Sequence, residues 1–171
     1  GPFTYHHYVQ WAVDVPLLFI HRNDVFQDAE GITFRRFMNE GLQGYRANVG
    51  DWSLHLSTLF PDVRLKQHLE VRGADMCSPA MILALAAFHV GIFYNQDALD
   101  CALDYFDGWS SKEWQVMRAG VSVDGLNLRV RNGTLAEHGL RLLDFAERGL
   151  AIWENSAQRY LKILRPLLES R

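Results

Sequence analysis

The pattern of apolar residues changes near residue 75, and this change limits the folds open to the chain. Before it, short apolar runs such as Val15–His21 alternate with turn residues. After it, apolar residues recur at helical spacing almost without interruption. The pattern predicts an α+β fold, in which antiparallel strands and short helices in the first part pack with a mainly helical second part.

The first part contains a predicted hairpin and two predicted helices. We expect a strand over Val15–His21, a turn at Arg22-Asn23-Asp24 and a returning strand over Val25–Gln27. Thr33 is a predicted cap for a helix over Phe34–Asn39 that ends at Gly41. A polar loop over residues 44–51 precedes a further helix over Trp52–Phe60.

The second part predicts five helices. Pro79–Tyr94 is nearly all apolar, so we expect a helix that is buried on every side. It falls short of the roughly 20 residues that span a bilayer, and no membrane segment is predicted. The other helices are Asp97–Phe106, one from Ser110 to about Ala119, one from Thr134 to about Arg148, and Ala151–Leu168, which Pro166 kinks or ends.

Composition and termini exclude several classes of protein. The 171 residues carry 17 Lys+Arg against 20 Asp+Glu, so no basic excess favours nucleic-acid binding. Cys77 and Cys101 are too few for a disulfide framework, and we expect free thiols. Gly1-Pro2 is what a tag-cleavage protease leaves, so we expect an expression scar and no signal peptide. The aromatic rings expected to serve the core are Trp109, Trp114 and Trp153.

Residues 63–72 alternate between polar and apolar side chains, which is the period of a β-strand, with Gln67 the one polar residue among the apolar positions. A strand points alternate residues to opposite faces. We therefore predict a single strand over Val63–Val71, with its apolar face on a core and its polar groups spread over about 27 Å. The polar parity consists of Arg64, Lys66, His68, Glu70 and Arg72.

Two interpretations of this polar face stay open. A solvent-facing strand with cross-strand ion pairs shows the same alternation. A carboxylate beside guanidinium groups also suits a site where Mg²⁺ and phosphate meet. The carboxylate oxygens bind the metal, and the guanidinium binds phosphate or carboxylate oxygens in pairs. The spacing alone does not decide between them.

Five motifs occur in order between residue 8 and about residue 95. They are Tyr8–Pro16 (YVQWAVDVP), Thr33–Met38 (TFRRFM), Trp52–Lys66 (WSLHLSTLFPDVRLK), Leu69–Asp75 (LEVRGAD) and Ala84–Tyr94 (ALAAFHVGIFY). Together they resemble the plant and proteobacterial type of glutamate–cysteine ligase, a family with a glutamine-synthetase-like catalytic fold.

The resemblance implies a carboxylate–amine ligase that uses ATP and Mg²⁺. Such an enzyme phosphorylates the γ-carboxyl of glutamate, and the amine of cysteine attacks the acyl phosphate, which is the first step of glutathione biosynthesis. Glu70 matches the family's Mg²⁺ ligand, and Arg72 matches the catalytic arginine that faces phosphate and glutamate. Arg64, Lys66 and His55 are further substrate-binding candidates, with a structural role for His55 equally open.

The resemblance also implies a C-terminal half of a longer ligase, with residues 3–75 and 76–171 as the strand-containing and helical parts of one catalytic domain. We expect the isolated chain to be inactive, because the missing N-terminal half should hold most metal carboxylates and much of the ATP site. The implied partners are glutamate, cysteine, ATP and that missing half. The expected location is the cytoplasm, or a plastid in a plant or alga.

The chain departs from the family at several positions. His68 replaces an aromatic residue, and Met76–Met81 lacks the arginines of plant members. Two alternative functions therefore stay open. One is a non-catalytic interaction or regulatory module of ligase ancestry, and the other is a related ligase that joins glutamate to a different amine.

Overall fold

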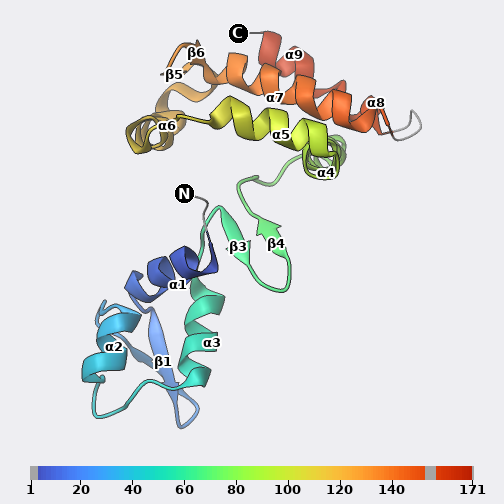
Figure 1. Cartoon of the computed structure of the whole chain (residues 1–171). Helices are drawn as coiled ribbons and strands as arrows, with labels where there is room; N and C mark the ends of the chain where they lie inside the picture. Colours follow the sequence, from blue (N-terminus) through green and yellow to red (C-terminus); the bar gives the residue numbers. More distant parts are fainter. Residues whose placement is uncertain (1–3, 153–156, 171) are drawn as a thin grey trace. The chain divides into compact units, whose positions relative to one another are not determined.

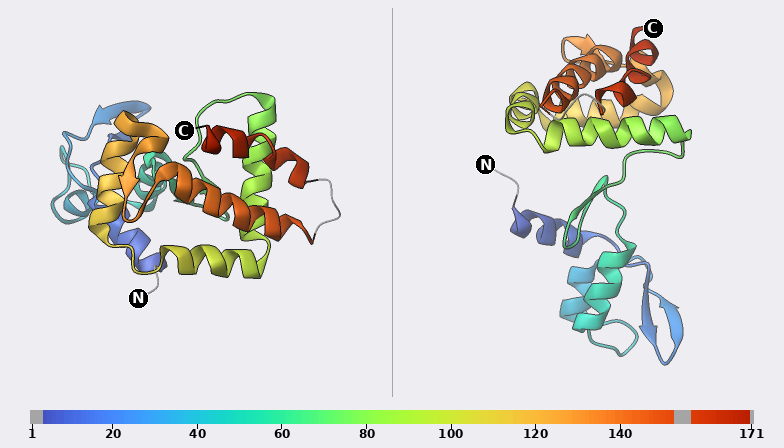
Figure 2. Two further views of the ribbon diagram at one scale, coloured as in Figure 1. Left: turned by 90° about the horizontal axis from the view of Figure 1, so that it is seen from above. Right: turned by 90° about the vertical axis from the view of Figure 1, so that its right-hand side faces the viewer.

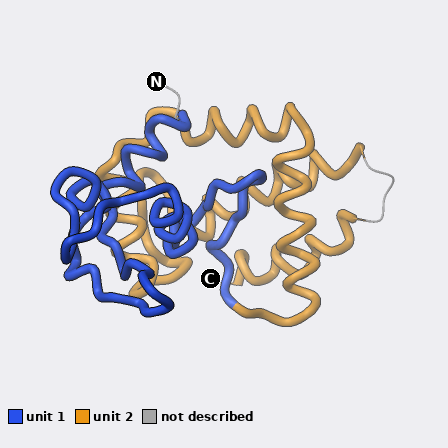
Figure 3. Tube along the Cα trace, turned by 90° about the horizontal axis from the view of Figure 1, so that it is seen from below, with its two compact units in different colours: residues 1–75 blue, residues 76–171 orange. Residues whose placement is uncertain are grey.

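A computed structural model describes residues 4–152 and 157–170. The chain divides into two compact units, Gly1–Asp75 (unit 1) and Met76–Arg171 (unit 2) (Figure 3). The predicted α+β class is confirmed: unit 1 combines short helices with antiparallel strand pairs, and unit 2 is mainly helical (Figure 1). Membership of both units in one catalytic domain stays a prediction. The expected scar and Trp153 lie outside the described residues.

Unit 1 begins with a helix that the sequence patterns did not reveal, α1 (Tyr5–Asp14). The predicted hairpin follows, as β1 (Phe19–Arg22) and β2 (Val25–Asp28), with β1 starting later than expected. Its turn residues Asn23 and Asp24 have φ of 51° and 58°, the left-handed pair that matches the twist of antiparallel strands.

The two predicted helices of unit 1 are present. In α2 (Phe34–Glu40), Thr33 caps the first turn by accepting from Arg36 N, and Gly41 ends the helix with φ of 81°. The next helix, α3 (Val49–Thr58), begins three residues before the predicted start, because Asn48 and Asp51 cap each other across its first turn. The core beneath these elements consists of Val13, Leu17, Ile20, Ala29, Phe34, Phe37 and Leu42.

The predicted single strand over Val63–Val71 is wrong, because the segment folds into the hairpin β3 (Val63–Leu65) and β4 (Leu69–Val71). Residues directly opposite each other in an antiparallel pair share a face. The register pairs Arg64 with Glu70, so the alternation of the sequence is preserved while the polar groups are brought together rather than spread out. The apolar parity is not packed on a core as expected: 68% of Leu69 is exposed.

Unit 2 is organised around α7 (Leu135–Leu150), which Thr134 caps as predicted. It contacts α4 (Pro79–Phe93), α5 (Gln96–Phe106), α8 (Gln158–Leu161) and α9 (Leu164–Glu169) (Figures 1 and 2). The other elements are α6 (Ser111–Asp124), the 3₁₀ helix η1 (Gly125–Asn127), and the strands β5 (Arg129–Val130) and β6 (Gly133–Thr134).

Two predictions for unit 2 are wrong. The continuous helix over Ala151–Leu168 is replaced by the short helices α8 and α9, and Pro166 is the third residue of α9, where no intrahelical N–H bond is lost. Helix α4 is buried on one face only, by contacts with α5, α7 and α8, whereas Ile82, Leu83 and Phe93 are about half exposed. Among the described residues, no single helix meets the length and apolarity needed to span a membrane, although α4 and α5, bent by 90°, do so as a pair.

Two glycines let α4 and α7 approach closely. A Cβ at Gly149 would lie 1.8 Å from the carbonyl oxygen of Gly91, and a Cβ at Gly91 would lie 2.4 Å from that of Ala146. Backbone atoms cannot rotate aside as a side-chain tip can, so this crossing admits only glycine at these two positions.

Replacement of Gly149 by alanine is therefore expected to destabilise unit 2 by about 1–3 kcal/mol, although alanine favours helix elsewhere. Gly139→Ala on the same helix is the matched control, because its Cβ would meet only the tip of Leu168 at 3.0 Å. Thermal unfolding of both variants measures the difference. Equal melting temperatures would contradict the backbone clash.

Candidate active site

The β3–β4 hairpin gathers three charged side chains on one face. Arg64 on β3 lies opposite Glu70 on β4, and Arg72 follows Glu70 by two residues. Arg64 donates from Nε to Glu70 Oε2 at 2.9 Å, and its second nitrogen, Nη2, lies 2.8 Å from the same oxygen. Arg72 donates from Nη1 to the other oxygen, Oε1, at 3.3 Å. One carboxylate is thus held between two guanidinium groups.

The surroundings of Glu70 favour its ionised form. The hydrogen bond from Arg64 lowers the pKa of Glu70 most, and the positive charges of Arg64, Arg72 and Lys66 lower it further. The Arg72 guanidinium also lies over the Phe60 ring, 5.3 Å from the centroid, which restricts where it points. The cluster carries two positive charges against one negative charge, so it retains attraction for an added anion.

Glu70 fits a metal site as one ligand but does not form one alone. The described part of the chain contains no group of three or more His, Cys, Asp or Glu side chains placed to hold a metal ion. A carboxylate offers about four lone-pair positions, and the long contact from Arg72 leaves Oε1 the less committed oxygen. Mg²⁺ is commonly held by one or two carboxylates together with substrate phosphates and water. The residues therefore fit a shared Mg²⁺ site.

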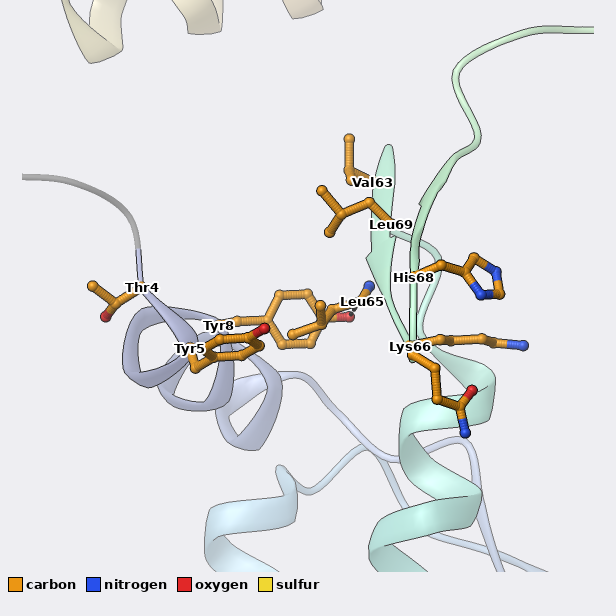
Figure 4. A pocket seen from close by; sticks show the side chains of 9 residues that line it. Thr4, Tyr5, Tyr8, Val63, Leu65, Lys66, His68 and Leu69 are labelled. Atoms are coloured by element: carbon orange, nitrogen blue, oxygen red, sulfur yellow. Dashed lines mark hydrogen bonds between the residues drawn. The ribbon is translucent and has the colours of Figure 1, made fainter. Parts of the chain in front are cut away.

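The structure separates the other predicted site residues. Lys66 lies in the exposed turn of the hairpin, and in Figure 4 it points away from α1, as does its neighbour His68, which was not among the predicted site residues. His55 lies in the core of unit 1 with 2% exposed, stacked on Phe34, and its Nε2 is 2.8 Å from the carbonyl oxygen of Ala12. Burial lowers the pKa of His55, although the hydrogen bond to Ala12 acts in the opposite direction. The burial and contacts of His55 favour a structural role in the core of unit 1 over contact with substrate.

Three further features of the described residues bear on what the sequence predicted. Phe60, which restricts where Arg72 points, was not predicted as part of the site. The two residues are separated in the sequence, and only the fold brings the ring against the guanidinium. Trp109 and Trp114 were expected in the core, yet they form an aromatic cluster with Phe106 in which 39% of Trp114 is exposed. Cys77 and Cys101 are free thiols, as predicted.

The fold and the cluster define a class of protein: a mixed α/β chain that holds an anion-attracting carboxylate–guanidinium site on an antiparallel hairpin. The model of glutamate-cysteine ligase family 2 matches residues 2–170, and the chain belongs to that family. The predicted family resemblance is confirmed.

Curated relatives include chloroplastic glutamate–cysteine ligases from three plants. The tobacco protein (Nicotiana tabacum) is 38% identical, the Arabidopsis thaliana protein 39%, and glutamate–cysteine ligase A of Oryza sativa subsp. indica 37%. Each alignment covers 86% of this chain but only 29–31% of the relative. The chain thus spans about 30% of the length of these relatives.

Proposed function

We propose that the chain is part of a glutamate–cysteine ligase that uses ATP and Mg²⁺ to join the γ-carboxyl of glutamate to the amine of cysteine. The observation that carries this proposal is the Arg64–Glu70–Arg72 cluster, which lies within the residues that the family model matches. The reaction brings two anionic substrates together, so it needs cationic groups in fixed positions. The product would enter glutathione biosynthesis.

Each residue of the cluster has a distinct proposed role. The planar guanidinium of Arg72 binds oxygens of phosphate and glutamate in pairs, which makes Arg72 the proposed catalytic residue. Arg64 holds Glu70 in position and adds positive charge toward substrate, and Lys66 adds a further cation from the turn. Glu70 is the proposed Mg²⁺ ligand, and a bound Mg²⁺ would neutralise charge that develops on phosphate oxygens.

The remaining parts of the site are proposed to come from the same polypeptide. The described chain supplies one candidate metal carboxylate, whereas Mg²⁺ needs six oxygen ligands in all. The partners are thus glutamate, cysteine, ATP and the portion of the ligase that this chain does not span. The names of the relatives place them in the chloroplast, which supports the plastid alternative, while the cytoplasmic location stays a prediction.

An activity assay on the intact polypeptide that contains this chain tests the proposal. We expect release of phosphate from ATP that depends on glutamate, on cysteine and on Mg²⁺. Other amines in place of cysteine separate this function from that of a ligase with a different acceptor. The 171-residue chain alone should give no turnover, because its metal site is incomplete. Turnover by the chain alone, or an intact protein without activity, would refute the proposal.

A further inference from the structure

A cavity of about 660 Å³ lies within unit 2 and shares no residue with the candidate active site. Its walls come from the last turn of α5 and the residues after it, the β5–β6 turn and the first turns of α7 (Figure 1). Half of the residues that line it are charged, namely Asp104, Asp107, Glu137, Arg131 and Arg141. The proposed ligase reaction assigns no role to this cavity.

A buried histidine sets the direction of the hydrogen bond at Tyr105, which also lines the cavity. His138 on α7 is 6% exposed, and its Nε2 lies 3.0 Å from the carbonyl oxygen of Val130. A carbonyl oxygen only accepts, so the single N–H of a neutral His138 ring is at Nε2. The other ring nitrogen, Nδ1, then accepts the hydroxyl of Tyr105 at 2.5 Å. The Tyr105 oxygen can therefore only accept further hydrogen bonds, and it needs a donor.

Charges of both signs line the cavity without pairing with one another. The side chains of Asp104, Asp107 and Arg141 are exposed and make no hydrogen bond or ion pair with any described residue. Carboxylates accept hydrogen bonds and a guanidinium donates them. The cavity therefore offers acceptors to a cationic group and donors to an anionic group at the same time, and a ligand that carries both groups is complementary to it.

Arg131 is a second guanidinium at this cavity, and its contacts leave it available. It lies over the Trp109 ring, 5.7 Å from the centroid, and its Nε is 3.7 Å from Glu113 Oε1. Its Nη1 donates to the carbonyl oxygen of Asp107 at 3.5 Å. These long contacts restrict where the side chain points but leave most of its five N–H donors unused. The Trp109 ring also packs edge-on against His138, with centroids 5.1 Å apart, so it forms an apolar wall.

We propose that this cavity binds a free basic amino acid such as lysine. The α-carboxylate of the ligand pairs with Arg141 and Arg131, and its two ammonium groups bind Asp104, Asp107 and the Tyr105 oxygen. Three carboxylates and two guanidinium groups line the cavity, so a ligand with one net positive charge balances them. Neither glutamate nor cysteine carries a second cationic group, so this site is additional to the proposed function.

Calorimetric titration of the intact polypeptide with L-lysine tests the site. Cadaverine lacks the α-carboxylate of lysine, and norleucine lacks its second ammonium group. We expect both to bind at least about tenfold more weakly than lysine, because each loses charge-assisted hydrogen bonds. The absence of saturable binding at millimolar lysine would overturn the proposal, and so would equal binding of the three compounds.

Substitutions of exposed side chains locate the binding. Arg141→Gln and Asp104→Asn each remove one charge from the cavity, and we expect each to weaken lysine binding at least about tenfold. Arg148→Gln on α7 and Asp100→Asn on α5 are the matched controls, because both residues are exposed and neither lines the cavity. Wild-type affinity in the two cavity variants, or an equal loss in the controls, would overturn the assignment. Lysine binding by a protein without ligase activity would refute the proposed function and leave this inference standing.

Discussion

Replacement of Glu70 by glutamine in the intact ligase is expected to lower kcat by a factor on the order of 10² or more. The change keeps the shape of the side chain but removes the charge that Arg64 and Arg72 stabilise. A glutamine would also be a poorer Mg²⁺ ligand, so the Mg²⁺ concentration required for half-maximal rate should rise. Steady-state kinetics at several Mg²⁺ concentrations measures both effects.

The companion change, Arg72→Lys, is expected to be poorly tolerated although it keeps the charge. An ammonium group cannot reproduce the planar pair of N–H donors that binds two oxygens at once. The side chains of Glu70 and Arg72 are 34% and 27% exposed, so thermal melts of both variants establish that the protein is folded before a loss of kcat is assigned to the site.

An exposed ion pair in the same unit supplies the controls. Arg36 and Glu40 lie on α2 with Nε and Oε2 2.7 Å apart and both side chains about 60% exposed. Glu40→Gln and Arg36→Lys make the same chemical changes outside the hairpin, and we expect near-wild-type kcat in both. If Glu70→Gln and Arg72→Lys also leave kcat near wild type, the cluster is a solvated ion-pair group and the site assignment fails.

The hairpin shows why the sequence predicted which charged side chains share a face better than it predicted the path of the backbone. Alternation over residues 63–72 is the same for one straight strand and for two strands paired in the register Arg64 to Glu70. The shared face of Arg64 and Glu70 was therefore predicted correctly, whereas the turn at Lys66-Gln67-His68 was not, since it contains no glycine or proline. Contacts such as Arg64 with Glu70 depend on that turn.

Local sequence signals predicted where helices begin more reliably than they predicted which residues are buried. The caps at Thr33 and Thr134 depend on hydrogen bonds within three residues, and both helices begin where expected. The burial of α4 depends on which elements pack against it, and no local pattern specifies that. His55 illustrates the same limit: its family motif was visible, but only the fold places it against Phe34 in the core.

The ion pair between Arg22 and Asp51 is expected to have the largest effect on stability. It joins β1 to α3: Arg22 donates from Nη1 and Nη2 to the two oxygens of Asp51 at 2.6 and 2.7 Å, and Asp51 is 4% exposed. Asp51→Asn would leave the Arg22 guanidinium partly buried without its counter-charge. We expect unit 1 to lose about 3 kcal/mol, measured by hydrogen exchange of amides in β1 and α3.

The loss should depend on pH in a defined direction. Burial acts to raise the pKa of Asp51, but the hydrogen bonds from Arg22 and from the Asn48 N–H outweigh it, so the pKa lies below the usual value. Because the pKa of Asp51 is lower in the folded state, the ion pair contributes its full stabilisation at pH values above the pKa of an unfolded Asp, about 3.9. The stabilisation is lost as the pH falls through the pKa of the folded state. Wild type and Asp51→Asn should therefore differ most near neutral pH and converge in acid.

Asp14 and Arg35 provide a matched control in the same unit. They also form a two-point pair, with Arg35 Nε 2.6 Å from Asp14 Oδ1 and Nη2 2.9 Å from Oδ2, but their side chains are 56% and 42% exposed. Water solvates both charges when the partner is removed, so Asp14→Asn should cost far less than Asp51→Asn. Equal losses in the two variants would show that burial of Arg22 does not decide the stability of unit 1, whereas a large loss at Asp51 alone identifies the buried charge as the cause.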